Sequence, residues 1–127
     1  MKKPLPTVAG CLLASLAAAP LTFAQDAPRA WDASPDVYKV IAESETHRII
    51  QVTWKPGQRD AFHSHPAGMG VYYVTNCKLS GRLPTSNNPQ SAERKAGQAR
   101  FQPKPTMSHS VENVGTSECR IVLFEPK

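Results

Sequence analysis

The fold of this chain is indicated most strongly by the sequence GQRDAFHSH at residues 57–65, together with GQARFQPKPTMSHSVEN at residues 97–113. Alternate residues of a β-strand share a face, so an extended first stretch points His63 and His65 the same way. Two rises of ~3.3–3.4 Å place them about 7 Å apart. If the second stretch forms a strand beside the first, it adds His109. Three of the four histidines of the chain would then meet at one point.

Three converging histidines have a definite chemical meaning. Three neutral imidazoles at ~2.0–2.1 Å from a divalent ion, with positions left open, are typical of a catalytic rather than a structural metal site. The predicted ligands are His63, His65 and His109, and the predicted cofactor is Fe, Mn, Ni, Zn or Cu. Imidazole suits several of these ions, so ligand type alone does not select one. The alternative interpretation is that the three histidines lie in the core or pocket and bind no metal.

The rest of the chain, from residue 37 onwards, is a series of short apolar runs separated by turn signals. Such a series predicts strands, and no stretch has a helical period with caps. Turns are expected at Pro56-Gly57, Ser80-Gly81, Ala96-Gly97 and Val114-Gly115. The pattern predicts an all-β sandwich, jelly roll or barrel. The expected strands cover residues 37–41, 47–54, 60–65, 71–74, 82–85, 93–95, 99–102, 107–113 and 119–125.

The two histidine stretches resemble the two sequence motifs of the cupin family. The first matches a glycine, five residues and then His-x-His, here Gly57 to His65. The second matches a glycine, five residues, a proline, and then a histidine with an asparagine four positions later, here Gly97 to Asn113. The resemblance covers roughly residues 37–127. It implies a single cupin jelly-roll barrel at 37–127 and a homodimer. The composition of residues 25–36 separately predicts an extended lead-in before this domain.

The chain departs from the family pattern at a position that matters for chemistry. The first motif of the family continues with a glutamate, but Met69 and Gly70 stand there, and no Asp or Glu occurs between His65 and Glu93. Glu112 does not substitute, because three residues along a strand from a histidine lies on the opposite face. A bound metal would therefore have three nitrogen ligands and no carboxylate ligand. Its full double charge favours anionic chelators at the open positions.

Two functions from different classes follow from this site. The first is a dioxygenase-like, metal-dependent enzyme acting on a small anionic or chelating organic substrate, because some members of the family are similar in using only histidines around Fe(II). The second is a non-catalytic periplasmic cupin that binds a metal or small ligand, which is favoured because the sequence assigns no acid or base. Tyr72 and Met107 are candidate substrate-pocket residues by strand parity, with ordinary core packing as the alternative.

Residues 1–24 have the features of a secretory signal peptide. Lys2 and Lys3 precede an apolar run at 8–19, and Ala24 ends a segment typical of a cleavage site. The run is too short for a membrane span. Cys11 superficially suggests a lipoprotein, but the apolar stretch follows this cysteine instead of preceding it. The expected location is the periplasm or the outside of a bacterium.

Charge and cysteine content narrow the class further. Removal of Lys2 and Lys3 leaves 13 basic against 10 acidic residues, a formal charge of +3. These cations are scattered, whereas nucleic-acid binding requires a basic patch or stripe. Cys77 and Cys119 remain after removal of residues 1–24. In an oxidising compartment an even number permits a disulfide, and the alternative is two small buried thiols.

Overall fold

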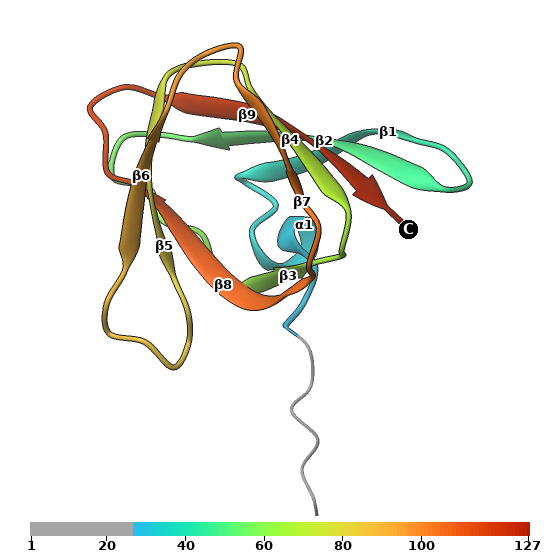
Figure 1. The fold of residues 1–127 in the computed structure, drawn as a ribbon, viewed down its shortest axis with the longest axis horizontal. Helices are drawn as coiled ribbons and strands as arrows, with labels where there is room; N and C mark the ends of the chain where they lie inside the picture. Colours follow the sequence, from blue (N-terminus) through green and yellow to red (C-terminus); the bar gives the residue numbers. More distant parts are fainter. Residues whose placement is uncertain (1–26) are drawn as a thin grey trace, which may run out of the picture.

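The computed structural model describes residues 27–127, which form two antiparallel sheets and one short helix (Figure 1). The larger sheet has five strands in the order β1-β2-β9-β4-β7, and the smaller has four in the order β3-β8-β5-β6. The described elements are α1 (Ala30–Ala33), β1 (Tyr38–Glu43), β2 (His47–Trp54), β3 (His63–His65), β4 (Met69–Tyr73), β5 (Cys77–Arg82), β6 (Gln90–Arg94), β7 (Ala99–Gln102), β8 (Thr106–Asn113) and β9 (Cys119–Pro126).

The apolar core is built mainly by the inner face of the larger sheet. Strands β2 and β9 bury alternate residues, as strands with one covered face must, and β4 buries Met69, Val71 and Tyr73 together with Gly70. Full burial of a side chain such as Ile50 contributes about 1.5–3 kcal/mol to stability. The buried core residues contributed by these three strands are Ile50, Val52, Trp54, Met69, Val71, Tyr73, Cys119, Ile121 and Leu123.

The smaller sheet presents polar side chains to the same interior. His63 and His65 on β3 are 0% and 4% exposed, and Ser110 and Asn113 on β8 are also buried. Strand β3 pairs with β8 so that His63 lies opposite His109, followed by a shift in register. These polar side chains of the smaller sheet therefore lie between the two sheets, facing the apolar inner side of the larger sheet.

A disulfide joins the two sheets. Cys77 begins β5 in the smaller sheet and Cys119 begins β9 in the larger one, with their Cα atoms 5.0 Å apart. This separation lies within the ~4.4–6.8 Å that a disulfide requires. The bond therefore fixes one end of the two sheets relative to each other.

Besides the strand expected at 82–85, of which only Arg82 lies in a strand, two expected local structures differ from the sequence-based prediction. Ser80 and Gly81 do not form a turn: they lie inside β5 and pair with Ser91 and Gln90 of β6. Strand β5 also pairs with β8 along its other edge, so pairing on both sides overrides the turn tendency of glycine. The chain instead reverses beyond Arg82, between the end of β5 and the start of β6.

The second difference is in the segment at 25–36, which was expected to be extended. Its described part contains the short helix α1, in which Ala30 is fully buried against the core. Trp31 packs on the core edge beneath the guanidinium of Arg48, 4.9 Å from its ring. The expected signal peptide at 1–24 lies outside the described residues. Among residues 27–127 no helix has the length and apolar character needed to cross a membrane.

Candidate metal centre

The three predicted histidines come together in the interior. The ring centroids of His63 and His65 are 4.7 Å apart, those of His63 and His109 are 4.6 Å apart, and those of His65 and His109 are 5.2 Å apart. One nitrogen from each ring lies within 4.8 Å of the other two. The pairing of β3 with β8 produces this arrangement, because it sets His109 directly across from His63.

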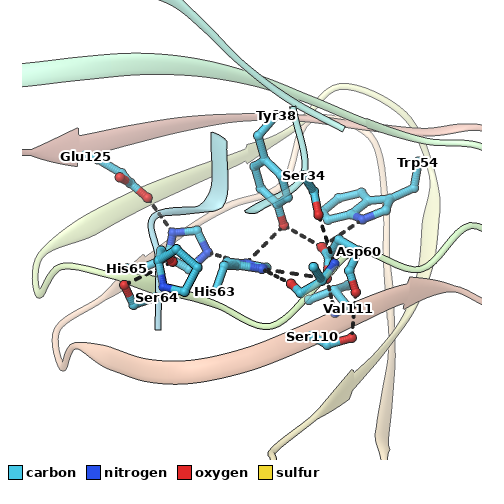
Figure 2. Close-up of polar contacts among 12 residues, drawn as sticks. Ser34, Tyr38, Trp54, Asp60, His63, Ser64, His65, Ser110, Val111 and Glu125 are labelled. Atoms are coloured by element: carbon cyan, nitrogen blue, oxygen red, sulfur yellow. Dashed lines mark hydrogen bonds and ion pairs between the residues drawn. The ribbon is translucent and has the colours of Figure 1, made fainter. Parts of the chain in front are cut away.

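Hydrogen bonds at the backs of two rings determine which nitrogens carry protons. His63 Nδ1 lies 2.8 Å from the carbonyl oxygen of Ala61, and His65 Nδ1 contacts a carboxylate oxygen of Glu125 (Figure 2). A carbonyl and an ionised carboxylate only accept hydrogen bonds, so both Nδ1 atoms are the donors. In the neutral rings the Nε2 atoms of His63 and His65 are therefore left with bare lone pairs.

These lone pairs converge without a proton to share. His63 Nε2 and His65 Nε2 lie 3.0 Å apart. Nε2 of His109 is also buried, and in the part of the chain that the structure describes it has no hydrogen-bond partner. Burial lowers the pKa of His63, and burial, with the nearby His63 and His65 rings, lowers the pKa of His109 to about 3. Protonation of these rings is therefore unfavourable, whereas a metal ion could accept a lone pair from each of the three nitrogens.

Asp60 forms a second layer behind His63. Its Oδ2 accepts hydrogen bonds from Tyr38 Oη at 2.7 Å and from Trp54 Nε1 at 3.0 Å. Its Oδ1 accepts from the backbone N–H of Val111 at 2.6 Å. Tyr38 Oη is also 3.2 Å from His63 Nε2, so the phenol stands between the carboxylate and the histidine cluster (Figure 2).

The charges of this region fit a divalent cation. The side chains of Asp60 and Glu125 are 0% and 1% exposed. Within residues 27–127 the only basic side chains within ion-pair distance of these carboxylates are His63 and His65, and a histidine that binds a metal carries no charge of its own. Burying a charge is costly unless it is paired. A divalent ion on the three neutral rings would offset both carboxylates, so the residues present fit such an ion.

Three members of this site were missed by the sequence analysis. Glu125 continues the alternation of Cys119, Ile121 and Leu123, so its burial was readable from strand parity. Tyr38 resembles an ordinary core residue of a short strand, and Asp60 lies on the loop before β3; neither has a sequence signal for its role. As predicted, Glu112 stands apart from the histidines, in an ion pair with Arg59.

Tyr72 does not line the histidine site. It shares a face with Gly70, as strand parity predicted, but that face points outward and Tyr72 is 43% exposed. Tyr72 instead lines a surface groove of about 740 Å³ together with Phe101 and Phe124. None of the three clustered rings lines this groove.

Met107 is also displaced from the predicted position. The register shift between β3 and β8 breaks the alternation between Met107 and His109, and Met107 becomes 57% exposed. It borders a separate surface pocket whose lining includes His65 and Thr106.

The histidine cluster opens onto a small interior cavity. The cavity has a volume of about 60 Å³, enough for a few waters at roughly 10–15 Å³ each. Tyr38, His65 and His109 line it beside apolar side chains of the core, and Arg100 also borders it. The arrangement can hold a small molecule directly against the predicted metal position.

No family model and no curated protein sequence matches the chain. Solved structures do. A cupin domain from Bordetella pertussis has a TM-score of 0.63 and 20% identity, covering 81% of this chain and 98% of that chain. An RmlC-like cupin family protein with a double-stranded β-helix fold, from Methanocaldococcus jannaschii, has a TM-score of 0.55 and 12% identity, covering 71% and 78%. The polyketide cyclase RemF from Streptomyces resistomycificus has a TM-score of 0.52 and 15% identity, covering 70% and 63%. The chain therefore has the double-stranded β-helix fold of cupin-domain proteins.

Proposed function

We propose that this protein binds one divalent metal ion through His63, His65 and His109 and acts as a dioxygenase-like enzyme on a small anionic or chelating organic molecule. One observation carries the metal proposal: the facing Nε2 atoms of His63 and His65 lie beside a buried His109 ring whose Nε2 has no partner among the described residues, and two buried carboxylates lie behind them. Fe, Mn, Ni, Zn and Cu are the candidate ions, since imidazole suits most of this group.

The cavity beside the cluster supports an enzymatic role. A bound divalent ion supplies Lewis acidity and a template for a ligand. The protein supplies a small space in which His65 and His109 lie beside apolar side chains of the core, and a bound molecule would displace water from it. Exclusion of water strengthens polar interactions with a bound molecule. The backs of two rings are held by Ala61 and Glu125, which keeps their Nε2 atoms aimed at one place.

A non-catalytic protein that holds a metal or small ligand is the second candidate. The observation in its favour is the depth of the cluster: His63 is 0% and His65 is 4% exposed. Such burial suits retention of an ion as well as it suits turnover. The two candidates share the same metal ligands and differ only in whether a bound molecule reacts.

Oxygen consumption separates these candidates. The mature protein is reconstituted with Fe(II) and oxygen uptake is recorded with a panel of diketones, phenols and thiols. The enzymatic proposal predicts uptake with at least one class and none with the His109→Ala variant. Stoichiometric iron without uptake for any class would favour the binding protein. His47→Ala is the matched control, because His47 is an exposed histidine on the first residue of β2.

Export is part of the proposal. The Cys77–Cys119 disulfide supports it, because disulfides persist mainly in oxidising compartments. Fractionation of bacterial cells expressing the full chain should recover the protein, lacking residues 1–24, in the periplasm or the medium. Recovery of the uncleaved chain in the cytoplasm would contradict export.

We also propose a homodimer that uses the outer face of the larger sheet. Phe101 is 80% exposed there, next to Tyr72 and Phe124. Apolar clusters of this kind are common at interfaces between proteins. Sedimentation analysis should give the mass of two chains, and Phe101→Ser should shift it toward one. A wild-type protein that sediments as a single chain would contradict the dimer.

A further inference from the structure

We infer that Arg100 selects the ligand of this site by binding a carboxylate carried by the same molecule that contacts the metal. This inference rests on the proposed metal centre and narrows the class of its ligands. The ligands that it predicts are short organic acids with a metal-binding group at one end and a carboxylate at the other.

The strand register points Arg100 toward the interior. Arg100 lies directly opposite Val71 in the pairing of β7 with β4. Residues directly opposite each other in an antiparallel pair share a face, and Val71 is buried in the core. Gln102, two positions further along β7, lies opposite the buried Met69 in the same way. The inner face of β7 therefore carries a charged and a polar side chain beside the apolar core.

Arg100 stands at the mouth of the cavity beside the histidine cluster. It lines this cavity together with His65 and His109, yet the residue is exposed and also borders the outer groove. A residue that borders both an interior cavity and the surface lies between the two. A small molecule held against the predicted metal position would thus have its other end near Arg100.

Two hydrogen bonds hold the guanidinium in place. Its Nε donates to Tyr73 Oη at 3.4 Å, and its Nη1 donates to Gln102 Oε1 at 3.3 Å. The amide nitrogen of Gln102 in turn donates to Thr106 Oγ1 at the start of β8, which sets the direction of Oε1. Within residues 27–127 these bonds occupy only part of the five N–H groups of the guanidinium. The others can donate to an anion, and arginine binds carboxylates through paired, charge-assisted hydrogen bonds.

The charge of Arg100 has no carboxylate partner in the described part of the chain. None of the ion pairs there includes it. Glu93 shares a surface pocket with Arg100 but pairs with Lys78 at 3.5 Å, and the buried Asp60 and Glu125 lie against the histidines. A divalent ion offset by those two buried carboxylates leaves no surplus positive charge for an anionic ligand. Arg100 supplies that charge at the mouth of the cavity.

An inward-pointing charge on an edge strand can also serve to discourage pairing with another chain. Strand β7 is the last strand of the larger sheet, so this role also fits Arg100. It needs a charge on the strand but no ligand. The two roles therefore differ in one measurable property, the preference of the site for a carboxylate.

The test compares ligands that differ by a carboxylate. The mature protein is loaded with whichever of the five candidate ions binds at one per chain. Acetohydroxamic acid, a metal chelator, and its carboxylated relatives malonic and succinic monohydroxamic acid are then titrated in by calorimetry. We expect the wild type to bind at least one carboxylated compound about 10–100-fold more tightly than acetohydroxamic acid, the effect of a hydrogen bond between charged groups. Arg100→Gln should lose most of this preference and keep its affinity for acetohydroxamic acid.

The chain provides a matched control in Arg94→Gln. This variant loses the same charge from a residue that shares a surface pocket with Arg100 but does not line the cavity beside the histidines. Its preference for a carboxylate should equal that of the wild type. Arg100→Lys keeps a charge but lacks the planar fork of a guanidinium, so its preference should be intermediate. The affinity for acetohydroxamic acid reports separately on the metal centre of each variant.

Each outcome decides the inference. A wild type that binds neither carboxylated compound more tightly than acetohydroxamic acid would overturn it, and this measurement needs no variant to fold. Full preference in Arg100→Gln would overturn it as well, as would an equal loss of preference in Arg94→Gln. All three results leave the metal centre standing, because they are obtained on protein that has already bound an ion. Failure of the wild type to bind any ion is a different result, and it overturns the proposed function together with this inference.

Discussion

His65 donates its Nδ1 hydrogen to the Glu125 carboxylate, which lies 60 residues further along the chain, and both side chains are buried. This contact links β3 of one sheet to β9 of the other. It orients the ring and makes its Nε2 a better electron-pair donor, as carboxylate partners of metal-bound histidines do. The sequence has no carboxylate at positions 69 and 70 that could bind the metal directly. Glu125 instead places a carboxylate against His65, a predicted metal ligand.

Glu125→Gln should weaken metal binding. The amide keeps the shape but removes the charge that supports His65, and loss of such a partner typically costs about 10–100-fold in metal affinity. Competition titration with a chelator measures the change. Glu112→Gln is the control, because Glu112 pairs with Arg59 on the surface. Equal affinities in the wild type and Glu125→Gln would show that the contact does not support a metal ligand.

Asp60→Ala should lower the free energy of unfolding by about 3 kcal/mol or more. The change leaves three buried donors, from Tyr38, Trp54 and Val111, without their acceptor, and each such loss costs about 1–3 kcal/mol. Urea denaturation of the metal-free protein measures it. Asp36→Ala removes an exposed carboxylate with one hydrogen bond, from Gln58, and should have little effect. Similar stabilities for both variants would exclude a central role for Asp60.

Reduction of the Cys77–Cys119 disulfide should also destabilise the protein. The bond spans a sequence separation of 42 residues, and bonds closing loops of this size typically contribute about 2–4 kcal/mol. Urea denaturation with and without a reductant gives the difference. In the double variant Cys77→Ser with Cys119→Ser the reductant should have no effect. A wild type whose stability is insensitive to reductant would contradict a structural role for the bond.

The alternating pattern in the sequence predicted the sheet architecture well, and long-range pairing explains where it did not. The strands at 47–54 and 99–102 have the expected bounds. Ser80 and Gly81 carry a local turn signal, but pairing with β6 and β8 on both sides decides their conformation. Gly57 and Gly97, with φ of 75° and 85°, do occupy turns as predicted.

Of the candidate site, only the three predicted metal ligands could be identified from the sequence. Motif spacing predicted His63, His65 and His109, and the structure brings them together because β3 carries the first two and β8 places His109 opposite His63. The residues behind them come from other strands and loops, and their roles depend on which sheet faces which. Parity correctly grouped Tyr72 with Gly70, but parity alone does not tell the inner face from the outer face. A one-residue irregularity in pairing likewise moved Met107 out of the group that includes His109.

The stability of the metal-free protein should fall as the pH decreases from 7 to 5. Burial lowers the pKa of His63 and, to about 3, that of His109. An unfolded chain protonates both rings below about pH 6.5, whereas the folded chain resists protonation. The unfolded state therefore binds more protons, and unfolding becomes easier by up to about 1.4 kcal/mol per pH unit for each ring. Urea titrations at several pH values measure this slope.

The His109→Asn variant provides the comparison for that slope. It removes one of the two rings that resist protonation, so its stability should depend less steeply on pH over the same range. Carboxylates titrate mainly below this range and should not obscure the difference. Parallel slopes for the variant and the wild type would mean that His109 is not held neutral by the fold.

Metal content measured on the wild-type protein and on His63→Ala and His109→Ala tests the central claim most directly. After reconstitution with Fe, Mn, Ni, Zn or Cu and removal of free ions, we predict one ion per wild-type chain for at least one metal and loss of that ion in both variants. Absence of stoichiometric metal from the wild type with all five would contradict the account, as would retention of the ion by the variants.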